Sequence, residues 1–111
     1  GNVYAYRDYG FAPNYMQAVY QMMTSDIPKD YVIGTGELIR LDIFIKKCFD
    51  YVGLRSEDHV KIDTSLFRKK DLNILKADSS LIKNDLGWTP TKSIDDIIHI
   101  MIDNDLKLIK Y

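Results

Sequence analysis

Cysteine and histidine are scarce in this 111-residue sequence, which has one cysteine and two histidines. The single Cys48 excludes an internal disulfide and a cysteine-rich metal cluster, and it is typical of a protein from the reducing cytoplasm. A zinc site based on histidine would have to borrow carboxylates, so we expect no metal. No apolar run reaches the roughly 18 residues of a membrane-spanning helix, so we expect no membrane partner.

A surplus of charge is also lacking. Fifteen lysines and arginines face sixteen aspartates and glutamates, which gives a formal net charge of −1. A nucleic-acid-binding protein needs excess cations to displace phosphate counterions, so we expect no general affinity for DNA or RNA. The length allows one domain with one modest core, and no repeat or flexible linker divides residues 1–111. Because the chain opens without methionine, in an apparent strand, we expect it to be part of a longer polypeptide.

Motifs for phosphate binding and nucleophilic catalysis are absent. The Gly34-Thr35-Gly36 turn lacks the third glycine of a dinucleotide-binding loop, and no Walker-type loop occurs. Cys48 lies on an apolar helical stripe, which favours a small core residue over a reactive thiolate. His59 and His99 are expected to be surface or half-buried side chains rather than catalytic bases. Residue pattern alone therefore indicates a soluble α/β chain without a self-contained active site.

Four helices and about three short strands are predicted, an α/β or α+β arrangement. The helical period of apolar residues predicts helices that begin near Pro13, Arg40, Ser79 and Ser93. Short strands are predicted at residues 3–9, 31–33 and 60–63 from their aromatic and β-branched content. Three such strands do not make a complete doubly wound sheet.

Three stretches together resemble a known family. They read GNVYAYRDYGFAPNY (1–15), YVIGTGELIRLDIFIKKCF (31–49) and IDTSLFRKKDLNILKADSSLIKNDLGWTP (62–90). In this order and spacing they resemble the C-terminal portion of GDP-mannose 4,6-dehydratases, which are extended short-chain dehydrogenases/reductases. The LGW-x-P motif and the Arg7-Asp8 pair are common to many extended nucleotide-sugar enzymes. The combination GN-x(4)-RD-[aromatic]-G-x-A-P with YVI-x-TGE is more specific to the dehydratase.

The resemblance implies a role for the whole chain. Residues 1–111 would form the C-terminal, nucleotide-sugar-binding lobe of a Rossmann-type enzyme, and the NADP-binding part would lie upstream, outside this chain. The chain alone would not be catalytic. The parent enzyme would be a cytoplasmic, homo-oligomeric lyase that converts GDP-mannose to GDP-4-keto-6-deoxymannose with NADP, in deoxysugar biosynthesis. Two alternatives stay open: the same lobe of another extended nucleotide-sugar epimerase or reductase, and a free-standing interaction domain that binds no nucleotide.

The resemblance also implies three substrate-binding residues: Arg7, Arg68 and Asp71. An arginine can donate two parallel hydrogen bonds to a phosphate, which suits both arginines to a diphosphate. Asp71 stands where the family has a glutamate that holds the ribose or base, and it is shorter by one methylene. Lys69 replaces a proline that stiffens the loop. The alternatives are a surface ion pair of Arg7 with Asp8 or with a glutamate, and a solvated run of cations at residues 68–70.

Three neighbouring residues have predicted supporting roles. Asp8 is expected either to orient nearby backbone as a structural partner or to take part in the site. Asn14 replaces an aspartate of the family and is expected to cap the first helix. Trp88 is expected to be a packed anchor for the last helix rather than a platform for a base.

Overall fold

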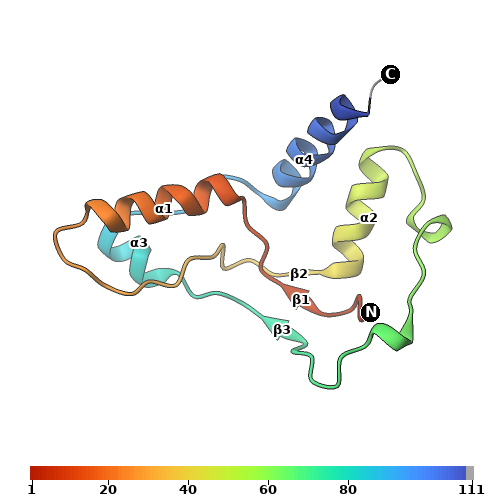
Figure 1. Ribbon diagram of the computed structural model, residues 1–111, viewed down its shortest axis with the longest axis horizontal. Helices are drawn as coiled ribbons and strands as arrows, with labels where there is room; N and C mark the ends of the chain where they lie inside the picture. Colours follow the sequence, from red (N-terminus) through yellow and green to blue (C-terminus); the bar gives the residue numbers. More distant parts are fainter. Residues whose placement is uncertain (110–111) are drawn as a thin grey trace.

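The computed structural model describes residues 1–109, and this part contains four α-helices and one small sheet (Figure 1). The helices are α1 (Ala12–Thr24), α2 (Leu41–Tyr51), α3 (Ser80–Leu86) and α4 (Ile94–Leu108). The strands are β1 (Tyr6–Arg7), β2 (Ile39–Arg40) and β3 (Ile74–Leu75), and two single 3-10 turns lie at Ser56–Asp58 and Thr64–Leu66. The predicted content of four helices and about three short strands is confirmed.

The sheet is a narrow mixed ribbon with β1 in the middle. Its strand order is β2-β1-β3, in which β1 runs antiparallel to β2 and parallel to β3. Tyr6 faces Arg40 on one side, and Arg7 faces Leu75 on the other. The central position of β1 therefore places Arg7 beside a segment that lies far away in the sequence.

The strand positions differ from the predictions. Residues 31–33 and 60–63 are not strands, and of residues 3–9 only Tyr6 and Arg7 pair with neighbours. Residues 31–33 have no regular secondary structure, and Ile33 packs against the buried core instead of joining a ladder. A strand exists only where a partner completes its hydrogen bonds, and local composition does not reveal that partner.

The helix ends follow the sequence signals. Pro13 lies in the first turn of α1, where its missing N–H costs no hydrogen bond. Gly87 closes α3 in the left-handed conformation at φ 70°, which a glycine adopts without strain, and its N–H donates to the Lys83 carbonyl. Ser93 and Asp96 form a reciprocal capping box at the start of α4.

The buried core is small for a chain of this length. Ala18, Ile82 and Trp88 form a cluster between α1 and α3, and Ile97 and Ile98 are buried on α4. The radius of gyration is 17.0 Å, whereas a compact domain of this size has about 13 Å. In Figure 1, α1 and α3 lie at one end of a flat molecule and α2 and α4 at the other, with the sheet below and between them.

A large apolar surface is consequently exposed. Met16, Tyr20 and Met23 lie on α1 at helical spacing and are 60%, 68% and 79% exposed. A contiguous apolar helix face of this kind is usually covered by another part of a protein.

Candidate functional site

The structure brings the three predicted site residues to one cavity. Arg7, Arg68 and Asp71 line a pocket of about 310 Å³. Gly1, Asn2 and Leu66 complete its wall. Its volume is at the lower end of the range of small-molecule sites, about 300–1,000 Å³. The role of these residues in binding stays a prediction.

Arg7 is held in place by two contacts. Its Nη2 atom donates to Asp71 Oδ1 at 2.8 Å, and its Nη1 atom donates to the Tyr6 carbonyl at 2.8 Å. The two side chains of the ion pair are 24% and 26% exposed. A guanidinium has more N–H donors than these contacts use, so Arg7 is oriented and can still donate to an anion.

Asp71 contributes to the pocket in a way that the sequence did not indicate. Its carboxylate binds Arg7, so the expected surface ion pair of Arg7 exists, but with Asp71 instead of Asp8 or a glutamate. Arg68 lies in the exposed segment between the second 3-10 turn and β3, on the same pocket wall. Two arginines and one carboxylate thus surround the cavity, which leaves it with an excess of positive charge.

Asp8 orients backbone on the opposite side of β1. Its carboxylate accepts hydrogen bonds from the N–H groups of Thr35, Gly36 and Ala77 and from the Thr35 hydroxyl. This geometry matches the predicted structural role of Asp8. It also engages the N–H groups of the Gly34-Thr35-Gly36 turn, so these are not free for a cofactor phosphate.

Asn14 does not cap α1, contrary to the prediction. Phe11 is the N-cap residue, and it makes no side-chain hydrogen bond. The Asn14 side chain is buried instead, donating to Thr91 Oγ1 at 2.9 Å and accepting from Thr91 N–H at 3.2 Å. The N-terminus of α1 therefore lies against the segment that precedes α4. The Asn14 amide suits this position because it can donate one hydrogen bond and accept another at the same time.

Trp88 is packed, as predicted, but against α1 and α3 rather than against the last helix, α4. It is 4% exposed, it belongs to the cluster with Ala18 and Ile82, and its indole N–H donates to the Asn14 carbonyl at 3.0 Å. A buried indole usually needs such a partner. Trp88 therefore fixes α3 against α1.

The histidines lie at the surface, as the sequence predicted, whereas Cys48 is only half-buried and does not belong to the core. His59 is exposed and stacks on Phe49, and His99 is exposed and stacks on Tyr51. Cys48 is half-buried in α2, and burial raises the pKa of its thiol, so the thiolate is disfavoured at neutral pH.

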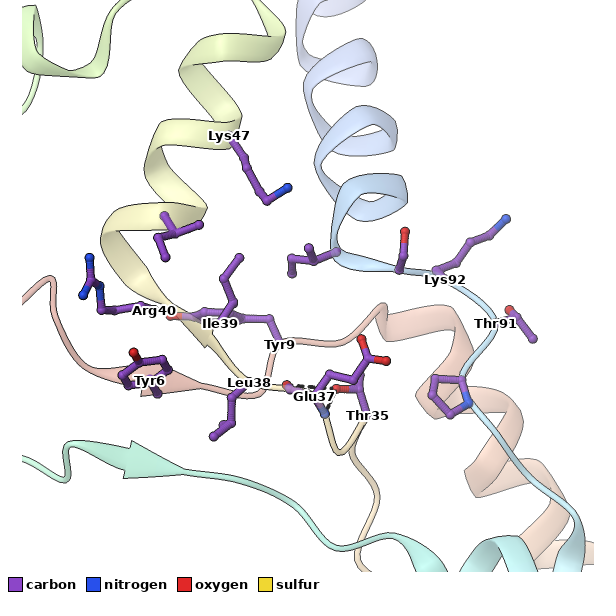
Figure 2. A pocket seen from close by; sticks show the side chains of 14 residues that line it. Tyr6, Tyr9, Thr35, Glu37, Leu38, Ile39, Arg40, Lys47, Thr91 and Lys92 are labelled. Carbon is purple, nitrogen blue, oxygen red and sulfur yellow. Dashed lines mark hydrogen bonds between the residues drawn. The ribbon is translucent and has the colours of Figure 1, made fainter.

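A second cavity of about 500 Å³ lies between the sheet, α2 and the start of α4 (Figure 2). Figure 2 shows Lys47 on α2, Glu37 on the turn before β2 and Lys92 before α4 around it. Lys47 is already paired with Asp95 at 2.9 Å. Arg40 also lines this cavity and is paired with Asp42 at 2.6 Å. Ion pairs thus neutralise two of its three cations, and Glu37 offsets the charge of Lys92. This balance of charge favours no single class of ligand. No local sequence pattern indicates this cavity, because its lining comes from separate segments.

Within residues 1–109, no group of three or more His, Cys, Asp or Glu side chains is placed to hold a metal ion. No helix in the same residues combines the length and apolarity needed to span a bilayer.

The fold is similar to that of a solved structure. The structure of RMD from Pseudomonas aeruginosa, complexed with NADPH, matches 98% of this chain and 35% of its own chain with a TM-score of 0.81. The sequence identity is 13%, so the match concerns the fold. It defines the class of fold: the chain has the architecture of about a third of that structure, with four helices and one small mixed sheet.

Sequence comparison is more specific. The model of the GDP-mannose 4,6 dehydratase family matches residues 1–101. GDP-mannose 4,6 dehydratase 1 of Arabidopsis thaliana is 41% identical over 110 residues, and the human GDP-mannose 4,6 dehydratase is 29% identical over 127 residues. These matches cover 99% of this chain but only 30% and 34% of the two relatives. The chain belongs to the GDP-mannose 4,6-dehydratase family and spans about a third of the length of these relatives, which confirms the resemblance seen in the sequence.

Proposed function

We propose that residues 1–111 are the C-terminal, nucleotide-sugar-binding portion of a GDP-mannose 4,6-dehydratase. The observation that carries this proposal is the meeting of Arg7, Arg68 and Asp71 at one pocket in a member of this family. The parent enzyme would eliminate water from GDP-mannose to give GDP-4-keto-6-deoxymannose. We expect it to be a cytoplasmic homo-oligomer.

The charges of the pocket fit the diphosphate of a GDP-sugar. Arg7 is pre-oriented by Asp71 and by the Tyr6 carbonyl, so little side-chain freedom is lost when an anion arrives. Arg68, on the same wall, can add a second charge-assisted contact to the same diphosphate. Asp71 keeps acceptor capacity for a ribose hydroxyl beside its contact with Arg7.

The cofactor of the parent enzyme does not fit the residues described here. NADP needs free N–H groups in a glycine-rich turn. In the one turn of this kind, the N–H groups of Thr35 and Gly36 donate to Asp8. We therefore propose that NADP binds to parts of the parent enzyme outside this chain, and that this chain alone is not catalytic.

The small core supports a dependent portion rather than a free-standing interaction domain. A radius of gyration of 17.0 Å and a long exposed face on α1 are unusual for a chain that folds alone. The other alternative is the same lobe of an epimerase or reductase. Such an enzyme would differ from a dehydratase in the nucleotide sugar that it uses and in the product that it forms.

The test uses the full-length polypeptide that carries this chain. Incubated with NADP, it should convert GDP-mannose to the 4-keto-6-deoxy product, and UDP- or dTDP-sugars should compete poorly. Turnover of a UDP- or dTDP-sugar to an epimer or a reduced sugar would favour the epimerase or reductase. Absence of any nucleotide-sugar binding would favour the interaction domain.

A further inference from the structure

Asp8 connects three segments that meet only in the folded chain. Its Oδ1 atom accepts from Thr35 N–H at 3.0 Å and from the Thr35 hydroxyl. Its Oδ2 atom accepts from Gly36 N–H at 2.7 Å and from Ala77 N–H at 3.3 Å. One half-buried carboxylate thus joins the end of β1, the turn before β2 and the segment that links β3 to α3.

Glycine makes this close approach feasible. A Cβ atom on Gly34 would lie 2.2 Å from Ala77 Cβ and 3.3 Å from Asp8 Oδ2, so no larger residue fits without a shift. Gly36 has a φ of 75°, which a glycine adopts without strain. The Ser79 hydroxyl also donates to the Gly34 carbonyl at 3.0 Å. In Figure 1 the two segments run side by side between α3 and the sheet.

The hydrogen bond from Ala77 N–H to Asp8 is important because the β1–β3 pairing is very short. Its register rests on two residue pairs, Tyr6 with Ile74 and Arg7 with Leu75. The Tyr6 N–H donates to the Asn73 carbonyl at 2.7 Å, which holds one end of residues 73–77. The bond from Ala77 to Asp8 holds the other end.

Asp71 lies just before residues 73–77, which hydrogen bonds hold at both ends. Neighbouring side chains of an extended chain point to opposite sides, so Arg7 faces the pocket while Asp8 faces the turn behind β1. The 2.8 Å contact between Arg7 and Asp71 therefore depends on residues 73–77 staying in register.

We propose that Asp8 is a positioning residue for the nucleotide-sugar pocket. Its carboxylate fixes residues 73–77 against β1 and so keeps Asp71 opposite Arg7. Asp8 touches no ligand in this role. The inference rests on the proposed function of the Arg7–Arg68–Asp71 pocket and adds the residue that keeps its two sides aligned.

Asp8→Asn in the full-length protein tests this role. An amide of the same size presents an NH₂ group where one oxygen now accepts, so at least one of the facing N–H groups loses its partner. We expect GDP affinity, measured by calorimetry, to fall about tenfold, and NADP affinity to stay unchanged. Hydrogen exchange of the peptide covering residues 71–77 should become faster.

Asp42→Asn is the matched control. Asp42 is also half-buried beside the sheet, where it binds Arg40, but it does not touch residues 71–77. Its substitution should lower thermal stability while GDP affinity stays within about twofold of wild type. Equal losses of GDP affinity in the two variants would overturn the proposal, because loosening of the sheet would then explain both.

A double-mutant cycle separates positioning from general stability. In an Arg7→Ala background, Asp8→Asn should change GDP affinity little, because the side chain that it aligns is gone. An undiminished tenfold loss there would overturn the positioning role. If Arg7→Ala weakens GDP binding and Asp8→Asn does not, only this inference fails. If Arg7→Ala and Arg68→Ala both bind GDP like wild type, the proposed function fails and the role of Asp8 in binding fails with it.

If Asp8→Asn does not fold, hydrogen exchange of the wild-type protein tests the role of Asp8 instead. The amides of Thr35, Gly36 and Ala77 should exchange as one protected group, since one carboxylate holds all three. A freely exchanging Ala77 amide beside protected Thr35 and Gly36 amides would overturn the proposal.

Discussion

Arg7 and Asp71 are 64 residues apart in the sequence and form an ion pair of 2.8 Å. The pair depends on the parallel pairing of β1 with β3, in which Arg7 lies opposite Leu75. Arg68 lines the same cavity as the pair, and this proximity makes its effect on nucleotide binding testable.

Arg68→Ala in the full-length protein should weaken GDP-sugar binding by roughly 1.5–3 kcal/mol, the usual contribution of a hydrogen bond to a charged group. This corresponds to about tenfold to a hundredfold in affinity. Arg7→Ala should have a similar effect. Arg68→Lys should recover only part of the loss, because a point charge cannot donate two parallel bonds to a phosphate. Calorimetry with GDP and the Michaelis constant for GDP-mannose measure these effects, and NADP affinity should not change.

The two arginines should not act additively. If both bind one diphosphate, the double variant loses less than the sum of the single losses. Arg55→Ala is a suitable control, since the Arg55 side chain is 76% exposed and its contact with Glu57 is 4.0 Å long. An Arg68→Ala protein with an unchanged Michaelis constant would show that residues 68–70 are a solvated loop.

The 111-residue chain alone should neither bind NADP nor turn over GDP-mannose. The N–H groups of Thr35 and Gly36 are engaged by Asp8, and the sequence has no other candidate glycine loop. Calorimetry with NADP at low micromolar concentration is the measurement. Saturable binding in that range would contradict the proposal that the cofactor site lies elsewhere.

The same chain should self-associate as its concentration rises. Met16, Tyr20 and Met23 are exposed on α1, and a mainly apolar cavity of about 930 Å³ lies between α1 and residues 87–91. Light scattering should detect oligomers, and Met23→Lys should reduce them, because a charge at a 79% exposed apolar position opposes association. A strictly monomeric species that binds no hydrophobic dye would favour a free-standing domain.

Helices were predictable because their signals are local. Pro13, Gly87 and Ser93 mark helix ends within one turn of chain, and the 3.6-residue period marks the buried faces. The two-residue strands β2 and β3 carry no such pattern, since alternation needs a longer run. Residues 31–33 have strand composition without a strand partner.

The site was predictable only in part. Family motifs pointed to Arg7, Arg68 and Asp71, but no local pattern pairs Arg7 with Asp71. The buried contact between Asn14 and Thr91 spans 77 residues and was missed for the same reason. Contacts between distant segments depend on the register of short strands, which a single sequence does not encode in any local pattern.

Trp88→Ala should destabilise the full-length protein by about 3–5 kcal/mol, as large-to-small changes of buried aromatic residues do. Trp88 is 4% exposed and contacts the Ala18–Ile82 cluster. Trp88→Phe should cost less, because it keeps an aromatic ring and loses mainly the indole bond to the Asn14 carbonyl. Urea unfolding measures both. Equal losses would show that the hydrogen bond, rather than packing, holds this anchor.

The capping box of α4 should make stability depend on pH. The backbone N–H of Ser93, and then its side chain, lower the pKa of Asp96. Because this pKa is lower in the folded chain than in the unfolded one, its stabilising contribution is present above about pH 4, the ordinary value of an aspartate, and is lost as the pH falls through the folded value. Asp96→Asn should therefore lower the free energy of unfolding at pH 7 and change it much less at about pH 2, well below the ordinary pKa of an aspartate. Ser93→Ala should cost about 1 kcal/mol at pH 7, the usual contribution of an N-cap. Urea unfolding at several pH values compares the two variants with wild type. A loss for Asp96→Asn that is the same at pH 7 and at about pH 2 would show that the charge of Asp96 does not stabilise α4.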